Sequence, residues 1–247
     1  MKKILITGGP TNEYIDEVMK ITNMSTGSLS TKLGGLFLDG GYDVTLILNN
    51  SVNTDKLSGR DNLHIIFVET TAEMMDAIYR CSQEKKYDAA VHAAAVGDYT
   101  GEFSFLLEDL AQELFNMKDS LNSPEDFLKV MENPQCKLDD SSKISSYQKN
   151  LTVKLGLTPK IIGRLREWLG DTLLIGCKLL ENVPKEELYQ VAQKLCIKNN
   201  MDYIMANDLA DLRKGMTARH IVTEEGYSGI SLETPQDIYE FIDKALH

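Results

Sequence analysis

The chain has 247 residues, of which 43% are hydrophobic and 26% charged, and its formal net charge is −11. This composition is typical of folded globular proteins and excludes general disorder, because the apolar content offsets the loss of chain entropy. No stretch approaches the roughly 18 apolar residues of a membrane span, so we expect no membrane insertion. The acidic balance argues against nucleic-acid binding, which requires a basic surface.

The length suits a single α/β domain of 1–247 with a small addition. Residues 1–9 contain an apolar core of only Ile4, Leu5 and Ile6, which is too short for a signal peptide. No C-x-x-C motif occurs, so neither a zinc knuckle nor a disulfide framework is indicated. We therefore predict a cytoplasmic protein with reduced thiols at its four cysteines, Cys81, Cys136, Cys177 and Cys196.

Short apolar runs alternate with amphipathic segments in the first hundred residues. We predict strands at 3–7, 42–48, 63–68 and 87–95, and helices at 26–39 and 71–85. This β-α-β-β-α-β order indicates an α/β fold, with a mostly parallel sheet and helices on both faces. Ligands of such folds bind at the carboxyl ends of the strands, so the segments at 8–9 and 95–99 should lie near one another.

The stretch 100–150 differs, because it is polar and charged. We interpret it as an excursion from the sheet, either a lid or a subunit-contact arm, with helices at 103–117 and 124–133. An apolar pattern typical of the core resumes at 151–155. The remaining elements are predicted to be helices at 159–169, 184–200 and 235–246, strands at 172–178 and 201–208, and a hairpin at 220–230.

The first candidate site combines Gly8 and Gly9 with Ser25, Thr26 and Gly27, which directly precede a predicted helix. Backbone amides and the helix dipole would bind an anion there. The alternative is ordinary N-capping by Ser or Thr.

Three further candidates lie at strand ends or in loops. Small residues at Ala94 and Ala95 would let a ligand approach the backbone. Asp98 either accepts from ligand hydroxyls, holds a metal or belongs to a turn. Lys143 either closes over phosphates or is solvated. Asn207 ends an apolar strand, where it either contacts a ligand or caps a helix.

Other chemistries lack their signatures. The four histidines show no metal-ligand spacing, and His92 lies in an apolar strand, which indicates a satisfied core histidine. Absence of Gly-x-Ser-x-Gly argues against a hydrolase, and absence of Tyr-x-x-x-Lys argues against an NAD(P)-dependent reductase.

Taken in order, these motifs resemble phosphopantothenate–cysteine ligase, an enzyme family of coenzyme A biosynthesis. The resemblance runs from Ile4 to about Leu209. The chain looks like the free-standing bacterial form of the family, which lacks a fused flavin decarboxylase half. The resemblance is carried by Ile6–Gly9 with Glu13 and Asp16, and by the segments 22–27, 94–99, 142–146, 151–155, 176–180 and 202–208.

The resemblance implies a Rossmann-like fold, an inserted lid or dimerisation arm, and a homodimer. It also implies a reaction in which the carboxylate of 4′-phosphopantothenate attacks CTP or ATP, assisted by Mg²⁺, to give an acyl-nucleotidylate. The amine of L-cysteine then displaces the nucleoside monophosphate. No base for that amine and no metal-binding residue is implied.

The resemblance assigns roles to three groups of residues. Lys143 and Asn23 would be catalytic. The nucleotide would contact Gly8, Gly9, Ser25, Thr26, Gly27, Cys177, Lys178 and Asn207. The phosphopantothenate would contact Asn23, Ala94, Ala95, Asp98 and Lys20.

This sequence departs from the family pattern at Pro10, Met19 and Cys177, where relatives carry a glycine, an arginine and an aromatic residue. Lys20 is adjacent to Met19, but an ammonium does not reproduce a bidentate guanidinium. These departures motivate the alternative of a catalytically weakened nucleotide-binding protein or subunit of the same fold.

Overall fold

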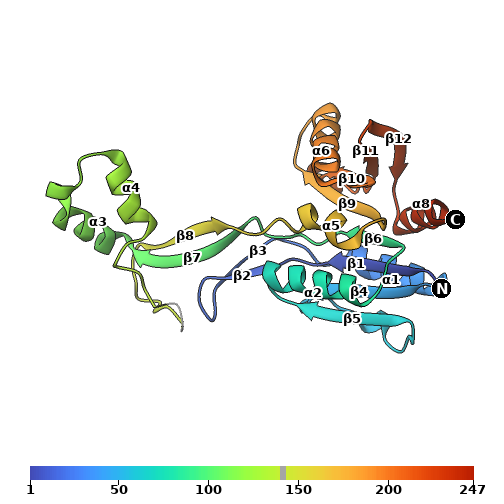
Figure 1. The fold of residues 1–247 in the computed structure, drawn as a ribbon, viewed down its shortest axis with the longest axis horizontal. Helices are drawn as coiled ribbons and strands as arrows, with labels where there is room; N and C mark the ends of the chain where they lie inside the picture. Colours follow the sequence, from blue (N-terminus) through green and yellow to red (C-terminus); the bar gives the residue numbers. More distant parts are fainter. Residues whose placement is uncertain (140–142) are drawn as a thin grey trace. The chain divides into compact units, whose positions relative to one another are not determined.

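The computed structural model describes residues 1–139 and 143–247 and divides into two compact units (Figure 1). The first unit comprises Met1–Thr11, Asn23–Val96 and Pro159–His247. The second comprises Asn12–Thr22 and Gly97–Thr158, and so contains the stretch 100–150 together with a short segment from near the N-terminus. None of the helices in these described ranges is long and apolar enough to cross a membrane.

The first unit is built on a sheet in the order β12-β11-β10-β9-β6-β1-β4-β5. Neighbours from β5 to β10 run parallel, while β11 and β12 are antiparallel. The mostly parallel, Rossmann-like α/β fold is therefore confirmed. The strands are β1 (Lys3–Gly8), β4 (Asp43–Asn49), β5 (Leu63–Val68), β6 (Ala89–His92), β9 (Leu173–Leu180), β10 (Tyr203–Asp208), β11 (Arg219–Thr223) and β12 (Gly226–Leu232).

Helices cover both faces of this sheet. The helices α1 (Ser28–Asp39) and α8 (Pro235–Leu246) pack on one face, where Ile4 and Ile6 of β1 are fully buried. The other face buries Leu5 beneath α2 (Thr71–Glu84), α5 (Leu165–Leu169) and α6 (Lys185–Asn199). Since successive residues of a strand point to opposite faces, the continuous apolar run of β1 serves both layers.

The second unit contains a long two-stranded ribbon of β7 (Tyr99–Leu106) and β8 (Leu151–Leu157), paired antiparallel. Lys154 of β8 forms an ion pair of 2.6 Å with Glu102 of β7, and its ammonium lies 5.3 Å from the centroid of the Phe103 ring. The unit also holds a short hairpin and two helices: β2 (Asn12–Tyr14), β3 (Lys20–Thr22), α3 (Leu107–Asn116) and α4 (Pro124–Glu132).

Three predicted elements were wrong in part. The helix predicted at 103–117 begins at Leu107, because the residues before it belong to β7. The helix predicted at 159–169 is a 3-10 turn, η3 (Ile161–Arg164), followed by the short α5. The segment 151–155, predicted to rejoin the core, pairs with β7 outside the main sheet. Short elements not predicted are β2, β3, η1 (Asp55–Leu57), η2 (Lys118–Ser120) and α7 (Leu209–Arg213).

Candidate functional site

The loops after β1 and β6 meet at the carboxyl edge of the sheet in the first unit. Gly9 directly follows β1, and its carbonyl accepts a hydrogen bond of 2.8 Å from the amide of Ala95. The amide of Thr11 donates back to the Ala95 carbonyl at 3.3 Å. The two segments that were expected to converge, 8–9 and the region from Ala95, are therefore joined by backbone hydrogen bonds.

Two glycines of this edge approach each other so closely that no side chain fits between them. Gly9 and Gly27 have positive φ angles of 80° and 67°. A Cβ atom on either residue would lie 2.6 Å from Cγ2 of Val52, and one on Gly27 would also lie 3.2 Å from the Gly9 amide nitrogen. Gly8 is equally restricted, because a Cβ atom there would collide with the side chain of Ser30. Glycine is thus required at all three positions.

The N-terminus of α1 carries no side-chain cap. Its N-cap is Gly27, and the first turn contains no acidic residue. The hydroxyls of Ser25 and Thr26 accept only long contacts of 3.4 Å, from the amides of Gly27 and Ser28. Serine or threonine N-capping, the alternative considered from the sequence, is therefore not how this helix begins. The amides of the first turn and the helix dipole instead offer a local positive potential in an acidic chain.

Asn23 is anchored to the loop after β6. Its side-chain amide donates to the carbonyl of Val96 at 2.9 Å and to that of Ala95 at 3.4 Å. A carboxylate of similar shape could not donate these bonds. The structure therefore brings Asn23 and Ala95 together, two of the residues expected to contact phosphopantothenate.

Thr7 and His92 form a buried polar pair beneath this loop. Thr7 Oγ1 lies 2.8 Å from His92 Nδ1 and also accepts from the amide of Ala94 at 3.3 Å. Burial lowers the pKa of His92 to about 4, so its ring is neutral at physiological pH. The interpretation of His92 as a satisfied core histidine is confirmed. Its link through Thr7 to Ala94 was not predicted.

Strand alternation separates the three site candidates of β9 and β10. Cys177 packs in the layer of α1 and α8, together with its register partner Met205. Asn207, two residues after Met205, points to the same face, whereas Lys178 points to the opposite face. Burial raises the pKa of the Cys177 thiol to about 11, so it is protonated at neutral pH and is a poor nucleophile.

The remaining candidates belong to the second unit. Lys20 is exposed on β3, where its register partner is Tyr14 of β2. Lys143 is exposed, and the amide of the next residue, Ile144, donates to the Asp16 carboxylate at 2.9 Å. The carbonyl of Asp98 accepts from the amide of Thr158 at 3.1 Å. Lys143 therefore lies beside the turn that leads into Lys20.

Comparison with known proteins shows which domain the chain resembles. Residues 1–106 match the model of the DNA/pantothenate metabolism flavoprotein C-terminal domain. The chain is 31% identical over 208 residues to the coenzyme A biosynthesis bifunctional protein CoaBC of Thermococcus kodakarensis. The aligned region covers 84% of this chain and 41% of that protein. The chain thus spans less than half the length of this curated relative.

A solved structure matches over the full length. The crystal structure of the DNA/pantothenate metabolism flavoprotein from Streptococcus pneumoniae superposes with a TM-score of 0.78 at 29% identity, covering 100% of this chain and 98% of that one. These matches show that the chain is similar to this family. The resemblance to the phosphopantothenate–cysteine ligases is thereby confirmed.

A more distant structure shares the fold of the DNA/pantothenate metabolism flavoprotein family. It is a Cab2 variant in complex with phosphopantothenate-cysteine, with a TM-score of 0.65 at 16% identity, covering 99% of this chain and 85% of that one. At this identity the comparison supports the fold alone.

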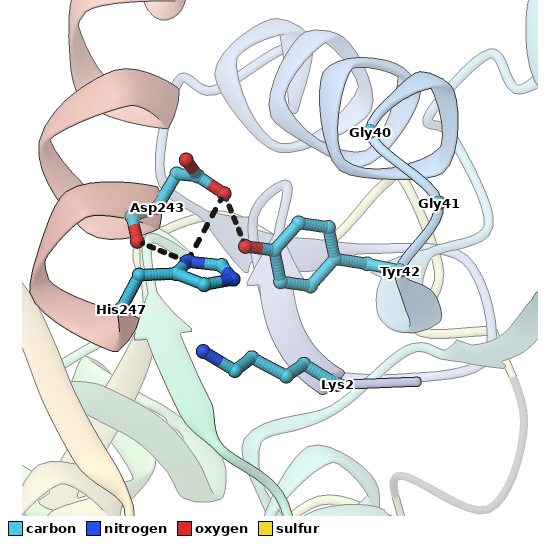
Figure 2. A pocket seen from close by; sticks show the side chains of 6 residues that line it. All are labelled: Lys2, Gly40, Gly41, Tyr42, Asp243 and His247. Atoms are coloured by element: carbon cyan, nitrogen blue, oxygen red, sulfur yellow. Dashed lines mark hydrogen bonds and ion pairs between the residues drawn. The ribbon is translucent and has the colours of Figure 1, made fainter.

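Two hollows of the structure lie away from the site candidates. One is lined by residues that precede β1 and β4 and by the end of α8 (Figure 2). Tyr42 donates there to the Asp243 carboxylate, and the ring of His247 contacts the Asp243 carbonyl at 2.9 Å. Because these polar groups satisfy one another at the amino edge of the sheet, we assign this hollow no role. The described residues contain no cluster of three or more His, Cys, Asp or Glu side chains suited to a metal ion.

Proposed function

We propose that this chain ligates 4′-phosphopantothenate to L-cysteine through an acyl-nucleotidylate, releasing pyrophosphate, a nucleoside monophosphate and phosphopantothenoylcysteine. The observation that carries the proposal is the uncapped N-terminus of α1 beside Gly9 and Gly27. It occurs in a chain that is similar to CoaBC, a coenzyme A biosynthesis protein.

The chemistry explains why such an anion site is needed. A carboxylate is a poor acyl donor until it acquires a good leaving group, and a nucleoside triphosphate supplies one. In the proposal, the amides of the first turn of α1 bind the triphosphate of CTP or ATP, and Mg²⁺ accompanies that nucleotide and neutralises phosphate charge. The proposed nucleotide contacts are Gly8, Gly9, Ser25, Thr26, Gly27, Cys177, Lys178 and Asn207.

We propose that phosphopantothenate binds beside the loop after β6. Its contacts are Asn23, Ala94, Ala95, Asp98 and Lys20. The hydrogen bonds from the Asn23 side chain to the carbonyls of Ala95 and Val96 support this grouping. They place the Asn23 amide next to the loop after β6, whose small side chains leave its backbone accessible to a ligand. Lys143 is proposed to stabilise negative charge as the carboxylate attacks the nucleotide.

The same proposal covers assembly and location. We propose a homodimer in which residues 100–150 act as a lid or a subunit-contact arm of a single ligase domain. Exposed apolar side chains on α3 and α4, including Leu107, Phe115 and Leu128, support a contact role for this stretch. The four cysteines are free thiols, which supports the cytoplasm as its location.

A coupled assay of pyrophosphate release tests the proposal. We expect release from CTP or ATP only when phosphopantothenate is present, and formation of the cysteine adduct once L-cysteine is added. Binding of a nucleotide without any release, at saturating phosphopantothenate, would instead support a catalytically silent nucleotide-binding protein. Running both nucleotides in parallel also determines the preference between CTP and ATP.

A further inference from the structure

The Asp16 carboxylate joins two distant segments of the second unit. Asp16 lies in the turn between β2 and β3 and is only 4% exposed. Its Oδ1 accepts from the amides of Val18 at 2.7 Å and Met19 at 2.6 Å, which closes its own turn. Its Oδ2 accepts from the amide of Ile144 at 2.9 Å, 128 residues further along the chain.

The chemistry of this contact favours a firm attachment. The hydrogen bonds from Met19 and Ile144 hold the pKa of Asp16 below its usual range, so the group is a carboxylate at neutral pH. Hydrogen bonds to an ionised acceptor are shorter and stronger than those between neutral groups. The Ile144 side chain is itself buried, with 8% exposure, so the segment is held by both its backbone and its side chain.

The attachment point determines what is held. We call the hydrogen bond from the Ile144 amide to the Asp16 carboxylate the tether. Because Lys143 immediately precedes Ile144 and is exposed, the tether constrains the backbone of Lys143 while its ammonium stays in solvent. Lys143 also lies close enough to Asp16 for its charge to lower the pKa of that carboxyl. On the other side of the tether, the Asp16 turn leads directly into Lys20 on β3. One carboxylate therefore accepts from the backbone next to each of the two lysines, from Met19 before Lys20 and from Ile144 after Lys143.

We propose that Asp16 is a positioning residue for Lys143: its carboxylate, by accepting from the Ile144 amide, fixes the backbone that carries the lysine within the second unit, and the reaction depends on that fixed backbone. The inference rests on the proposed function, since it assigns Lys143 a part in that reaction. Asp16 itself, whose oxygens are occupied by backbone amides, does not contact the substrate.

The Asp16→Asn variant separates the two halves of this arrangement. An asparagine oxygen can still accept from Val18 and Met19, whereas its NH₂ group cannot accept from Ile144. The matched control is Asp119→Asn, which removes the same charge from an exposed position of the second unit. A further variant, Ile144→Pro, leaves the Asp16 turn unchanged and removes the donor of the tether together with the buried Ile144 side chain, and it also restricts the backbone of Lys143.

Two measurements together test the tether. The first is hydrogen exchange of the Ile144 amide, followed by NMR, which we expect to accelerate about tenfold or more in Asp16→Asn but not in Asp119→Asn. The second is pyrophosphate release, in which kcat should fall about tenfold or more in Asp16→Asn and Ile144→Pro while KM for the nucleotide stays nearly unchanged. Adding Lys143→Ala to Asp16→Asn should cost little beyond Lys143→Ala alone, because both changes disable the same group.

The outcomes distinguish the tether from the function. Unchanged exchange at Ile144, or full kcat in a folded Asp16→Asn protein, would overturn the positioning role. Additive losses in the double variant would overturn it as well. If the unaltered protein released no pyrophosphate, the proposed function would fail, while the exchange measurement would still report on the tether. If Asp16→Asn did not fold, full kcat in Ile144→Pro would overturn the positioning role, because that variant lacks the donor of the tether altogether.

Discussion

Gly27→Ala is the substitution whose cost is best determined by the structure. Gly27 is the N-cap of α1 and has a φ of 67°. Placing a side chain in the left-handed region costs about 1–2 kcal/mol. The new methyl group would also lie 2.6 and 2.8 Å from the two Cγ atoms of Val52, which is buried in the core with 5% exposure. Overpacking of this kind adds about 1–3 kcal/mol. The expected loss in the free energy of unfolding is therefore about 2–5 kcal/mol.

Gly41→Ala provides a matched control for the backbone contribution. Gly41 has a φ of 80°, but a Cβ atom there would meet nothing within 4 Å. Its replacement should cost only the conformational part, about 1–2 kcal/mol. The difference between the two variants therefore isolates the collision with Val52.

Urea unfolding of both variants measures this difference, provided that each unfolds in one transition. Introducing Val52→Ala should cost less stability in Gly27→Ala than in the unaltered protein, because it opens space for the new methyl group. If Gly27→Ala were no more destabilising than Gly41→Ala, or if Val52→Ala cost as much in Gly27→Ala as in the unaltered protein, the close approach of Gly9, Gly27 and Val52 would not be the reason for glycine at this position.

Three further predictions concern the site. Lys143→Ala should reduce the rate of pyrophosphate release about a hundredfold or more with unchanged circular dichroism. Substitution of an exposed lysine nearby, Lys149→Ala, should retain the parental rate. Equal rates in the two variants would make Lys143 an ordinary solvated lysine. Asn23→Asp should accumulate acyl-nucleotidylate in rapid-quench experiments, because a carboxylate cannot donate to the Ala95 and Val96 carbonyls, and absence of that accumulation would count against its role. His92 binds a proton in the unfolded chain near pH 6.5 but in the native state only near pH 4. Its contribution to stability is therefore lost as pH falls between these values, by up to about 3 kcal/mol. Urea unfolding across that range should show a weaker pH dependence in His92→Gln, and identical profiles would refute the assignment.

The main sheet could be predicted because its signals are local. Runs such as 3–7 and 42–48 are apolar throughout and end at glycine or polar residues, which suits strands buried on both faces. The last helix was predicted with its observed bounds, since Thr234 and Asp237 form a capping box directly before its apolar face. Helix boundaries of this kind depend on few residues close together.

The ribbon could not be predicted in the same way. Phe103 and Phe105 are followed by leucines at helical spacing, so the segment was interpreted as one helix. Pairing with β8, some fifty residues later, makes its first part a strand instead. The hairpin of β2 and β3 is too short to show periodicity. Long-range pairing of this kind leaves no local signal.

Residues of the candidate site could likewise be predicted only where their signals are local in the sequence. Glycines and small residues at strand ends marked Gly9, Gly27 and Ala95, because close backbone approach constrains composition locally. The opposite orientation of Lys178 and Cys177 follows from strand alternation and was open to prediction. The contact between Asp16 and Ile144 was not, because 128 residues separate the carboxylate from its donor.

The contact between Asp98 and Thr158 has a consequence for the order of folding. Strands β6 and β9 are adjacent in the sheet, yet the chain between them passes through Gly97–Thr158. Closing so long a loop as a flexible coil would cost about 4 kcal/mol of chain entropy before any pairing energy is gained. The Thr158 amide and hydroxyl donate to the carbonyls of Asp98 and Gly97, so the segment brings its own ends together. A ribbon that forms early would therefore shorten the effective loop and speed the joining of the two halves of the sheet.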